Sequence, residues 1–267
     1  MPRPLPERAL ITGATSGIGR ATAELLAGKG VEVGILAERP AEVDETVAAI
    51  RQAGGTAIPV YADLTRREEI SGLIDRLEAE GFHIDALVNN AGIGLQADVL
   101  DTREEDLRRL FEVNYFAAFL LSRDVLRHMA RRGQGHIVNI SSASARRSLP
   151  GMSVYASTKA AMHSFSQALR IEAATSGVYV TELLPMSVRT RFFESATNRA
   201  RKPYSPGWKA HTPEEIAGQV LSALRHPVPE IYSSTLSRLV LGLDALFPSL
   251  SDAILLSRRK KQSRPKE

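Results

Sequence analysis

The chain has 267 residues, 43% hydrophobic and 24% charged, a balance typical of a folded globular protein rather than a disordered one. It contains no cysteine, which excludes disulfides, thiolate catalysis and cysteine-ligated metals, and its six scattered histidines predict no metal site. A single α/β domain of this length is common, and no shift in composition marks a second one.

The net charge of +4 comes from the C-terminus, because six basic residues and one acidic residue occupy positions 258–267. A nucleic-acid-binding face needs basic residues spread over a folded surface, so we expect no nucleic-acid partner. Positions 1–7 lack the order of a signal peptide, and no segment has the roughly 18 uninterrupted apolar residues of a spanning helix. We therefore expect a cytoplasmic protein.

Short strands rich in Val, Ile and Leu alternate with longer segments of helical periodicity. The expected strands are 9–12, 31–37, 57–62, 84–89, 136–141 and 178–184. The expected helices are 19–28, 41–53, 67–80, 102–131, 153–176 and 213–225. This order predicts an α/β fold: a Rossmann-like, doubly wound parallel sheet in three layers, forming one domain over residues 1–235.

Two segments depart from this alternation. Residues 186–211 combine four aromatic residues with prolines and a glycine, and we interpret them as a substrate lid. Residues 236–257 have the pattern of amphipathic helices broken at Pro248, and we expect the basic tail 258–267 to be disordered. Two interpretations stay open: the helices pack on their own subunit or a partner, or they make peripheral contact with an anionic membrane surface.

A glycine-rich turn follows the first strand and opens the first helix. Residues 12–19 read Thr-Gly-Ala-Thr-Ser-Gly-Ile-Gly. Glycines let a backbone turn tightly and approach a pyrophosphate, whose charge is met by the N–H groups at a helix N-terminus. Taken alone, the motif leaves open the alternative of three glycines in an ordinary turn.

Tyr155 and Lys159 are four residues apart on an expected helix, so the phenol and the ammonium share one face. A free tyrosine has a pKa of about 10, and a nearby ammonium lowers it. Tyr155 is therefore a candidate acid and base. Ser142, at the end of the preceding strand, can reach the same cleft; Ser141 competes with it, because neighbouring strand residues face opposite sides.

Together with Asn-Asn-Ala-Gly at 89–92 after the fourth strand, these motifs resemble the short-chain dehydrogenase/reductase family from about residue 8 to 190. The resemblance implies an NAD(P)-dependent oxidoreductase that interconverts an alcohol and a ketone or aldehyde, forming a homodimer or homotetramer. It makes Asn114, Ser142, Tyr155 and Lys159 the catalytic residues, with Asn114 holding a water that relays protons. A non-catalytic nucleotide sensor on the same fold is the rival.

The resemblance also places the cofactor. It assigns binding to Gly13, Thr15, Ser16, Gly17, Ile18, Gly19, Glu38, Arg39, Asp63, Leu64, Asn90, Ala91, Gly92, Tyr155, Lys159, Pro185, Val188 and Thr190. Glu38 favours ribose hydroxyls and Arg39 a 2′-phosphate, so NAD and NADP both stay open, and repulsion by the carboxylate favours NAD. Asp63 resembles an adenine-contacting residue, and a plain helix N-cap is the alternative.

The expected substrate side contains Ser144, Met186, Phe192 and Phe193. Met186 stands where the family usually has glycine; methionine does not take a positive φ cheaply, and its side chain would narrow the pocket. The aromatic lid and the apolar C-terminal segment favour a medium or large apolar alcohol or carbonyl compound.

Overall fold

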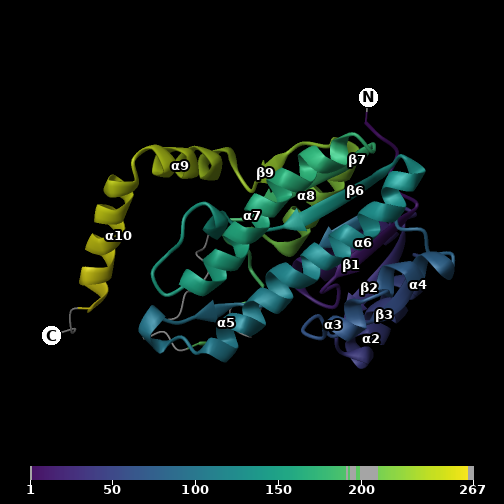
Figure 1. Cartoon of the computed structure of the whole chain (residues 1–267), viewed down its shortest axis with the longest axis horizontal. Coiled ribbons are helices and arrows are strands. Elements are labelled where there is room, and N and C mark those ends of the chain that lie inside the picture. Colours follow the sequence, from purple (N-terminus) through teal and green to yellow (C-terminus); the bar gives the residue numbers. More distant parts are fainter. Residues whose placement is uncertain (1, 191, 193–196, 199–209, 264–267) are drawn as a thin grey trace.

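A computed structural model describes residues 2–190, 192, 197–198 and 210–263. Its centre is a parallel sheet with the strand order β3-β2-β1-β4-β6-β7-β9 (Figure 1). The strands are β1 Arg8–Thr12, β2 Glu32–Ala37, β3 Ala57–Tyr61, β4 Ala86–Asn89, β6 Gly135–Ile140, β7 Val178–Leu184 and β9 Glu230–Tyr232. Because the order reverses beside β1, the chain winds outward in both directions, and the edge beyond the strands' carboxyl ends is where such sheets bind ligands.

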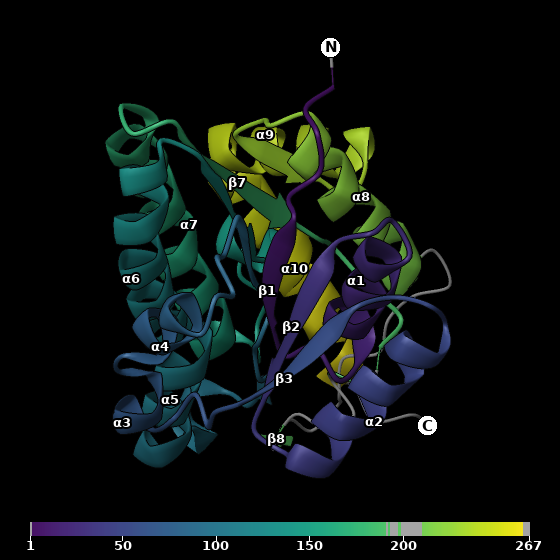
Figure 2. The same cartoon turned by 90° about the vertical axis from the view of Figure 1, so that its right-hand side faces the viewer.

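Helices cover both faces of the sheet (Figure 2). One face packs on α1 Gly17–Ala27, α2 Pro40–Gln52 and α8 Pro213–Arg225. The other packs on α3 Arg67–Ile70, α4 Leu73–Ala79, α6 Ala117–Arg132 and α7 Ser153–Ala174. Fully buried aliphatic residues of the strands fill both interfaces, as expected for a sheet covered on two sides. The predicted Rossmann-like, three-layer fold is confirmed.

Two of the predicted helices differ in detail, and some short strands were not predicted. The helix expected over 67–80 is two helices, because Gly72 has a left-handed φ of 72° between α3 and α4. The helix expected over 102–131 is α5 Glu104–Phe111, a π-helix over Glu112–Phe116, and α6. The short strand β9 was not expected, since three residues after a proline carry no periodic signal. A small parallel pair, β5 Leu95–Gln96 and β8 Thr197–Asn198, lies outside the main sheet.

The chain beyond β9 forms two helices, α9 Thr235–Leu246 and α10 Pro248–Ser263. Pro248 begins α10, at the break expected from the sequence. The helix continues to Ser263, well into the segment that we expected to be disordered from residue 258, because no glycine or proline interrupts it there. No single helix of the described chain has the length and apolarity to cross a bilayer; α9 with residues 248–257 meets both measures only as a pair bent by 107°.

Much of the lid expected over 186–211 lies outside the described residues, Phe193 included. Its two described ends lie together. Arg189 N donates to His211 O at 2.8 Å, and His211 N donates to Ser187 O at 2.9 Å. The two ends of the segment therefore lie side by side, at the carboxyl edge of the sheet after β7.

Candidate active site

A pocket of about 1080 Å³ lies at the carboxyl edge of the sheet. The glycine-rich loop, the segment after β4, the end of β6, the start of α7 and the segment after β7 all contribute to it. Among the residues expected from the sequence, it is lined by Gly13, Thr15, Ser16, Gly17, Ile18, Asn90, Ala91, Gly92, Ser142, Ser144, Tyr155, Lys159, Pro185, Met186, Val188, Thr190 and Phe192. Five separate chain segments thus meet at one site.

The glycine-rich loop is held in a conformation that leaves no room for side chains. Gly13 and Gly17 have φ of 62° and 52°, and a Cβ on Gly13 would lie 2.9 Å from the Cα of Ala91. The Asn90 side chain donates to Thr12 O at 2.9 Å and to Gly13 O at 3.1 Å. Such a cradle in front of the α1 N-terminus fits the pyrophosphate of a dinucleotide.

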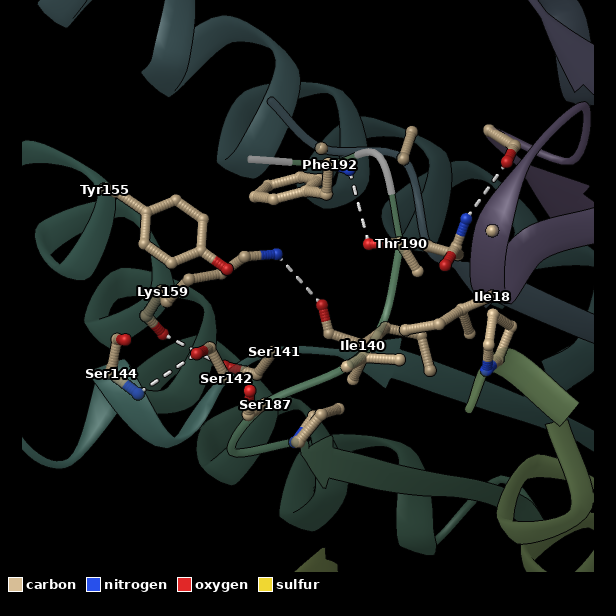
Figure 3. Close-up of a pocket in the computed structure, with 18 of the residues that line it drawn as sticks. Ile18, Ile140, Ser141, Ser142, Ser144, Tyr155, Lys159, Ser187, Thr190 and Phe192 are labelled. Atoms are coloured by element: carbon tan, nitrogen blue, oxygen red, sulfur yellow. Dashed lines mark hydrogen bonds between the residues drawn. The ribbon is translucent and has the colours of Figure 1, made fainter. Parts of the chain in front are cut away.

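Tyr155 and Lys159 extend from the first turns of α7 into this pocket (Figure 3). Lys159 Nζ lies 5.9 Å from the centroid of the Tyr155 ring and donates to Ile140 O at 3.0 Å. Both side chains are buried, at 6% and 4% exposure. The ammonium is therefore anchored to the end of β6 beside the phenol, the arrangement expected from their four-residue spacing.

Ser142 follows β6 and faces the same pocket (Figure 3). Its Oγ caps the 3-10 turn Ala143–Ala145 by accepting from Ser144 N at 3.1 Å. Its neighbour Ser141 donates instead to Lys159 O at 3.3 Å. The cap fixes the Ser142 hydroxyl oxygen, whose proton can still be given to a ligand.

A buried carboxylate lies behind Lys159. Burial lowers the pKa of Lys159 to about 8, and the charge of Glu182 on β7 opposes this shift. Glu182 is 1% exposed, and its Oε2 lies 2.6 Å from Nδ1 of His163, one helical turn beyond Lys159 on α7. We did not single out Glu182 from the sequence, although a charged residue within the apolar strand Val-Tyr-Val-Thr-Glu-Leu-Leu was a visible signal.

His163, Glu182 and Glu230 bring their ligand atoms within 4.8 Å of one another. Both ring nitrogens of His163 and one oxygen of each carboxylate have partners within the protein, whereas Oε1 of Glu182 is buried with no hydrogen-bond partner among the described residues. Arg146 contacts Nε2 of His163 at 2.7 Å, and the Tyr232 hydroxyl donates to Glu230 at 2.7 Å. Burial, with the hydrogen bond to Glu230, raises the pKa of Tyr232 to about 12. We therefore interpret the cluster as a structural one, in which the carboxylate of Glu182 on β7 holds His163 of α7 against the sheet.

Asn114 lies outside the pocket lining, in the π-helix between α5 and α6, and is 1% exposed. Its amide nitrogen donates to Ile93 O and to Thr158 Oγ1, both at 3.0 Å, and its oxygen accepts from Ile93 N at 2.8 Å. A Cβ on Gly92 would lie 3.3 Å from that oxygen and 3.6 Å from Lys159 Nζ. Asn114 thus clamps the segment after β4 against α7, next to Lys159. π-Helical turns often mark functional sites.

Glu38 and Arg39 lie exposed at the end of β2, outside the pocket lining. Arg39 forms an ion pair with Glu42 of α2. The other carboxylate oxygen of Glu42 accepts from the hydroxyl of Thr15 in the glycine-rich loop at 3.3 Å. The sequence analysis missed Glu42, which gives this end of the site a second carboxylate.

Asp63 follows β3, also outside the pocket lining. Its Oδ1 accepts from both the backbone and the hydroxyl of Thr65, at 2.8 and 2.7 Å. The alternative of a helix N-cap is wrong, because α3 begins after Arg66. The neighbouring Leu64 is buried in the core under α3 and α4, and Gly19 lies buried behind the glycine-rich loop.

Met186 lines the pocket mouth and is 47% exposed. No described residue other than glycine has a positive φ, so Met186 follows Pro185 without the strain that a glycine position would impose. Thr190 lies next to the glycine-rich loop, where a Cβ on Gly17 would come within 3.2 Å of its methyl group. The Phe192 ring packs 5.7 Å from that of Tyr155.

Comparison with known proteins agrees with this geometry. The short chain dehydrogenase family matches over residues 7–201, and the chain belongs to this family of oxidoreductases, which act on CH–OH or carbonyl groups with NAD(P). It is 33% identical over 249 residues to a fatty acyl-CoA reductase of Acinetobacter baylyi, covering 92% of this chain and 82% of the relative.

Two further relatives extend the comparison. A 3-oxoacyl-[acyl-carrier-protein] reductase of Synechocystis is 33% identical over 213 residues, covering 79% of this chain and 86% of the relative. A short-chain dehydrogenase from Sphingobium yanoikuyae, solved in complex with NADPH, superimposes with a TM-score of 0.78 at 27% identity, covering 98% of this chain and 97% of that one.

Proposed function

We propose that this enzyme interconverts an apolar alcohol and its ketone or aldehyde, with Tyr155 as the general acid and base. The observation that carries the proposal is the meeting of Tyr155, Lys159 and the capped Ser142 in one pocket beside a glycine cradle. These groups supply what the reaction needs at the substrate oxygen: a proton, a charge that tunes the proton donor, and an orienting hydroxyl.

In this mechanism Ser142 donates a hydrogen bond to the substrate oxygen and fixes its position. Tyr155 gives its phenolic proton to that oxygen in reduction and accepts it in oxidation. Lys159, held on Ile140 O, stabilises the phenolate with its positive charge. The loop at Gly13 and Gly17 would hold the pyrophosphate of a nicotinamide dinucleotide, which would supply or accept the hydride. Asn114 keeps the wall next to Lys159 in place, and we assign to it the water that reconnects Lys159 with solvent.

Because Glu182 acts on the pKa of Lys159, the mechanism predicts how the rate of carbonyl reduction depends on pH. The Lys159 ammonium is present below its pKa of about 8, so carbonyl reduction is expected to fall as the pH rises through 8. Glu182→Gln removes the charge that raises this pKa. The fall is then expected to begin at lower pH, by on the order of one unit.

The measurement is kcat for reduction as a function of pH. Glu230→Gln is the matched control, since this neighbouring carboxylate bonds Tyr232 and is expected to leave the profile in place. An unchanged pH profile in Glu182→Gln would show that the charge of Glu182 does not set the pKa of Lys159.

For the cofactor we propose NAD. The family resemblance would bring the 2′-phosphate of NADP to the end of β2, where Glu38 and Glu42 supply two carboxylates and Glu42 already pairs with Arg39. Repulsion of the phosphate then outweighs what the paired guanidinium offers. Hydride-transfer rates with NADH and NADPH test this directly, and a strong preference for NADPH would reverse the assignment.

The substrate class follows from the apolar part of the pocket lining. Leu149, Met152, Met186 and Phe192 line the pocket together with Tyr155, so an apolar group is favoured next to the reacting carbon. The names of two relatives, a fatty acyl-CoA reductase and a 3-oxoacyl-[acyl-carrier-protein] reductase, are consistent with carbonyl compounds that carry an apolar chain. We therefore propose a medium or large apolar carbonyl compound or alcohol.

Met186 offers a test of this pocket, because its side chain lines the pocket and is also half exposed to solvent. In a screen of alkyl, aryl and polycyclic carbonyl compounds with both cofactors, Met186→Gly is expected to gain activity selectively on the bulkiest compounds. The readout is the ratio of kcat/KM values for large and small substrates. Unchanged substrate preference and cofactor affinity in Met186→Gly would show that Met186 contacts neither the substrate nor the cofactor.

We also propose a homo-oligomer through the helices that carry Asn114 and Tyr155. The outer face of α6 and α7 supports it, because the exposed Phe119 lines a shallow hollow there with Phe165, and Phe116 is exposed at the end of the preceding π-helix. Sedimentation velocity measures the oligomeric state, and a monomer at all concentrations would contradict the proposed homo-oligomer.

A further inference from the structure

The last two helices form an arm that extends to one side of the sheet layers (Figure 1). We call α9 and α10, residues 235–263, the C-terminal arm. Within α9 the buried residues are Ser237 and Leu241. Nine large apolar side chains of the arm are 48% or more exposed: Leu236, Leu239, Val240, Leu243, Leu246, Phe247, Leu250, Ile254 and Leu256. The described residues leave this apolar surface uncovered.

These side chains are not scattered. Leu236, Leu239 and Leu243 recur at intervals of three and four on α9, and Leu250 and Ile254 are four apart on α10. Each helix therefore presents an apolar stripe. Val99 and Leu100, exposed at 71% and 97%, add to it, because they follow Asp98, which Arg259 of the arm contacts at 2.8 Å.

The acidic and basic residues of the arm lie in different places. Its two acidic residues, Asp244 and Asp252, both pair with Arg147 on the body, at 3.2 and 2.6 Å. Its basic residues are concentrated at the far end, where residues 258–261 read Arg-Arg-Lys-Lys. The arm therefore turns its negative charge toward the protein and ends in positive charge. An apolar stripe that ends in a basic cluster matches the interface of an anionic bilayer.

The dimensions of the arm favour lying on a bilayer over crossing it. The two helices have 12 and 16 residues, or about 18 and 24 Å at 1.5 Å per residue, against roughly 30 Å for the hydrocarbon core. They also meet at a bend of 107°. Neither helix spans alone, whereas both can rest in the headgroup region with their apolar stripes buried.

The arm is attached to the loops that border the pocket. Arg147 follows the 3-10 turn of Ser144, and Asp98 follows Ala97, whose backbone bonds Gly151 at 2.9 Å. Gly151 stands between the pocket residues Leu149 and Met152. The three ion pairs, two to Arg147 and one to Asp98, therefore hold the arm beside this part of the pocket lining.

We propose that the C-terminal arm docks this protein on the surface of anionic phospholipid bilayers. The proposal stands on the exposed stripes and the charge distribution, and it holds whether or not the proposed reaction is correct.

The test is co-sedimentation of the full chain with vesicles of phosphatidylcholine alone and of phosphatidylcholine with phosphatidylserine. The protein is expected to bind the phosphatidylserine vesicles, to bind the neutral ones much less, and to be released by salt. The triple variant Arg258→Gln, Lys260→Gln, Lys261→Gln is expected to bind about tenfold or more weakly. The matched control replaces three exposed basic residues elsewhere, Lys29, Arg67 and Arg76, and is expected to bind like the parent.

A second pair of variants tests the apolar stripe. Leu239→Ser with Leu243→Ser is expected to reduce vesicle binding, while Val228→Ser, at a 41% exposed site after α8, is expected to leave it unchanged. Thermal melting checks that all variants fold. Equal binding by parent and arm variants, or no binding to phosphatidylserine vesicles, overturns the proposal. So does dissociation of a dimer by the serine substitutions without loss of vesicle binding, since a second copy would then cover the stripe.

Discussion

Tyr155→Phe is expected to lower kcat by roughly 10²–10⁴-fold, the range that general acid–base catalysis contributes. The substitution keeps the ring, its 5.7 Å contact with Phe192 and its burial, and removes only the oxygen that exchanges the proton. Cofactor affinity is expected to remain, because the glycine cradle is untouched. The measurement is steady-state turnover of the best substrate from the carbonyl screen, with nicotinamide binding followed separately by fluorescence.

Tyr179→Phe is the matched control for this experiment. Tyr179 is 44% exposed on β7, and its ring, which Arg3 covers at 4.2 Å, is retained. It is expected to turn over like the parent. Full activity in Tyr155→Phe would contradict the mechanism, and no activity in the parent on any carbonyl compound or alcohol would favour a nucleotide sensor instead.

Gly19→Ala is expected to lower the free energy of unfolding by about 3 kcal/mol and to abolish tight cofactor binding. A Cβ on Gly19 would lie 2.2 Å from Gly13 O and 2.5 Å from the Asn90 side-chain nitrogen. Both neighbours belong to the cradle itself, and the backbone oxygen cannot move without opening the loop. Urea unfolding and cofactor titration measure the two effects.

Gly218→Ala provides the control within the same fold. Gly218 also lies inside a helix, α8, and nothing lies within 4 Å of where its Cβ would be. Here alanine is expected to stabilise the protein by about 0.5–1 kcal/mol, because it only restricts the unfolded chain. If the free energy of unfolding falls in Gly19→Ala and rises in Gly218→Ala, the loss at Gly19 comes from crowding in the glycine-rich loop and not from a general effect of alanine in helices. Similar values would indicate that α1 shifts to accept a methyl group.

Most of the fold could be predicted because its signals are local. Apolar runs identify the strands, and Thr212, Pro213 and Glu215 define the start of α8, which carries the expected capping box. The break at Gly72 was missed because a single glycine inside a helical pattern is usually tolerated. The strand β9 was missed because pairing with β7, not its own three residues, makes it a strand.

In the candidate site, too, the residues related by local geometry could be predicted and those brought together by tertiary packing could not. The spacing of Tyr155 and Lys159 predicts that they meet, since a helix fixes their relation. Glu182 is 23 residues from Lys159 in the chain and reaches it only because β7 packs on α7. Arg147 is a comparable case, for its partners on α9 and α10 lie about a hundred residues further along. Contacts made by tertiary packing leave no periodic mark in a sequence.

The 107° angle between α9 and α10 has a geometric meaning for an enzyme on a bilayer. One straight helix lying on a surface leaves the attached body able to roll about the helix axis. Two axes that cross define a plane and remove that rotation. If the arm docks on a bilayer as proposed, the ion pairs to Arg147 and Asp98 would carry this fixed orientation to the pocket, which would then keep one tilt relative to the lipid. An apolar substrate dissolved in the bilayer would meet the enzyme in a two-dimensional search.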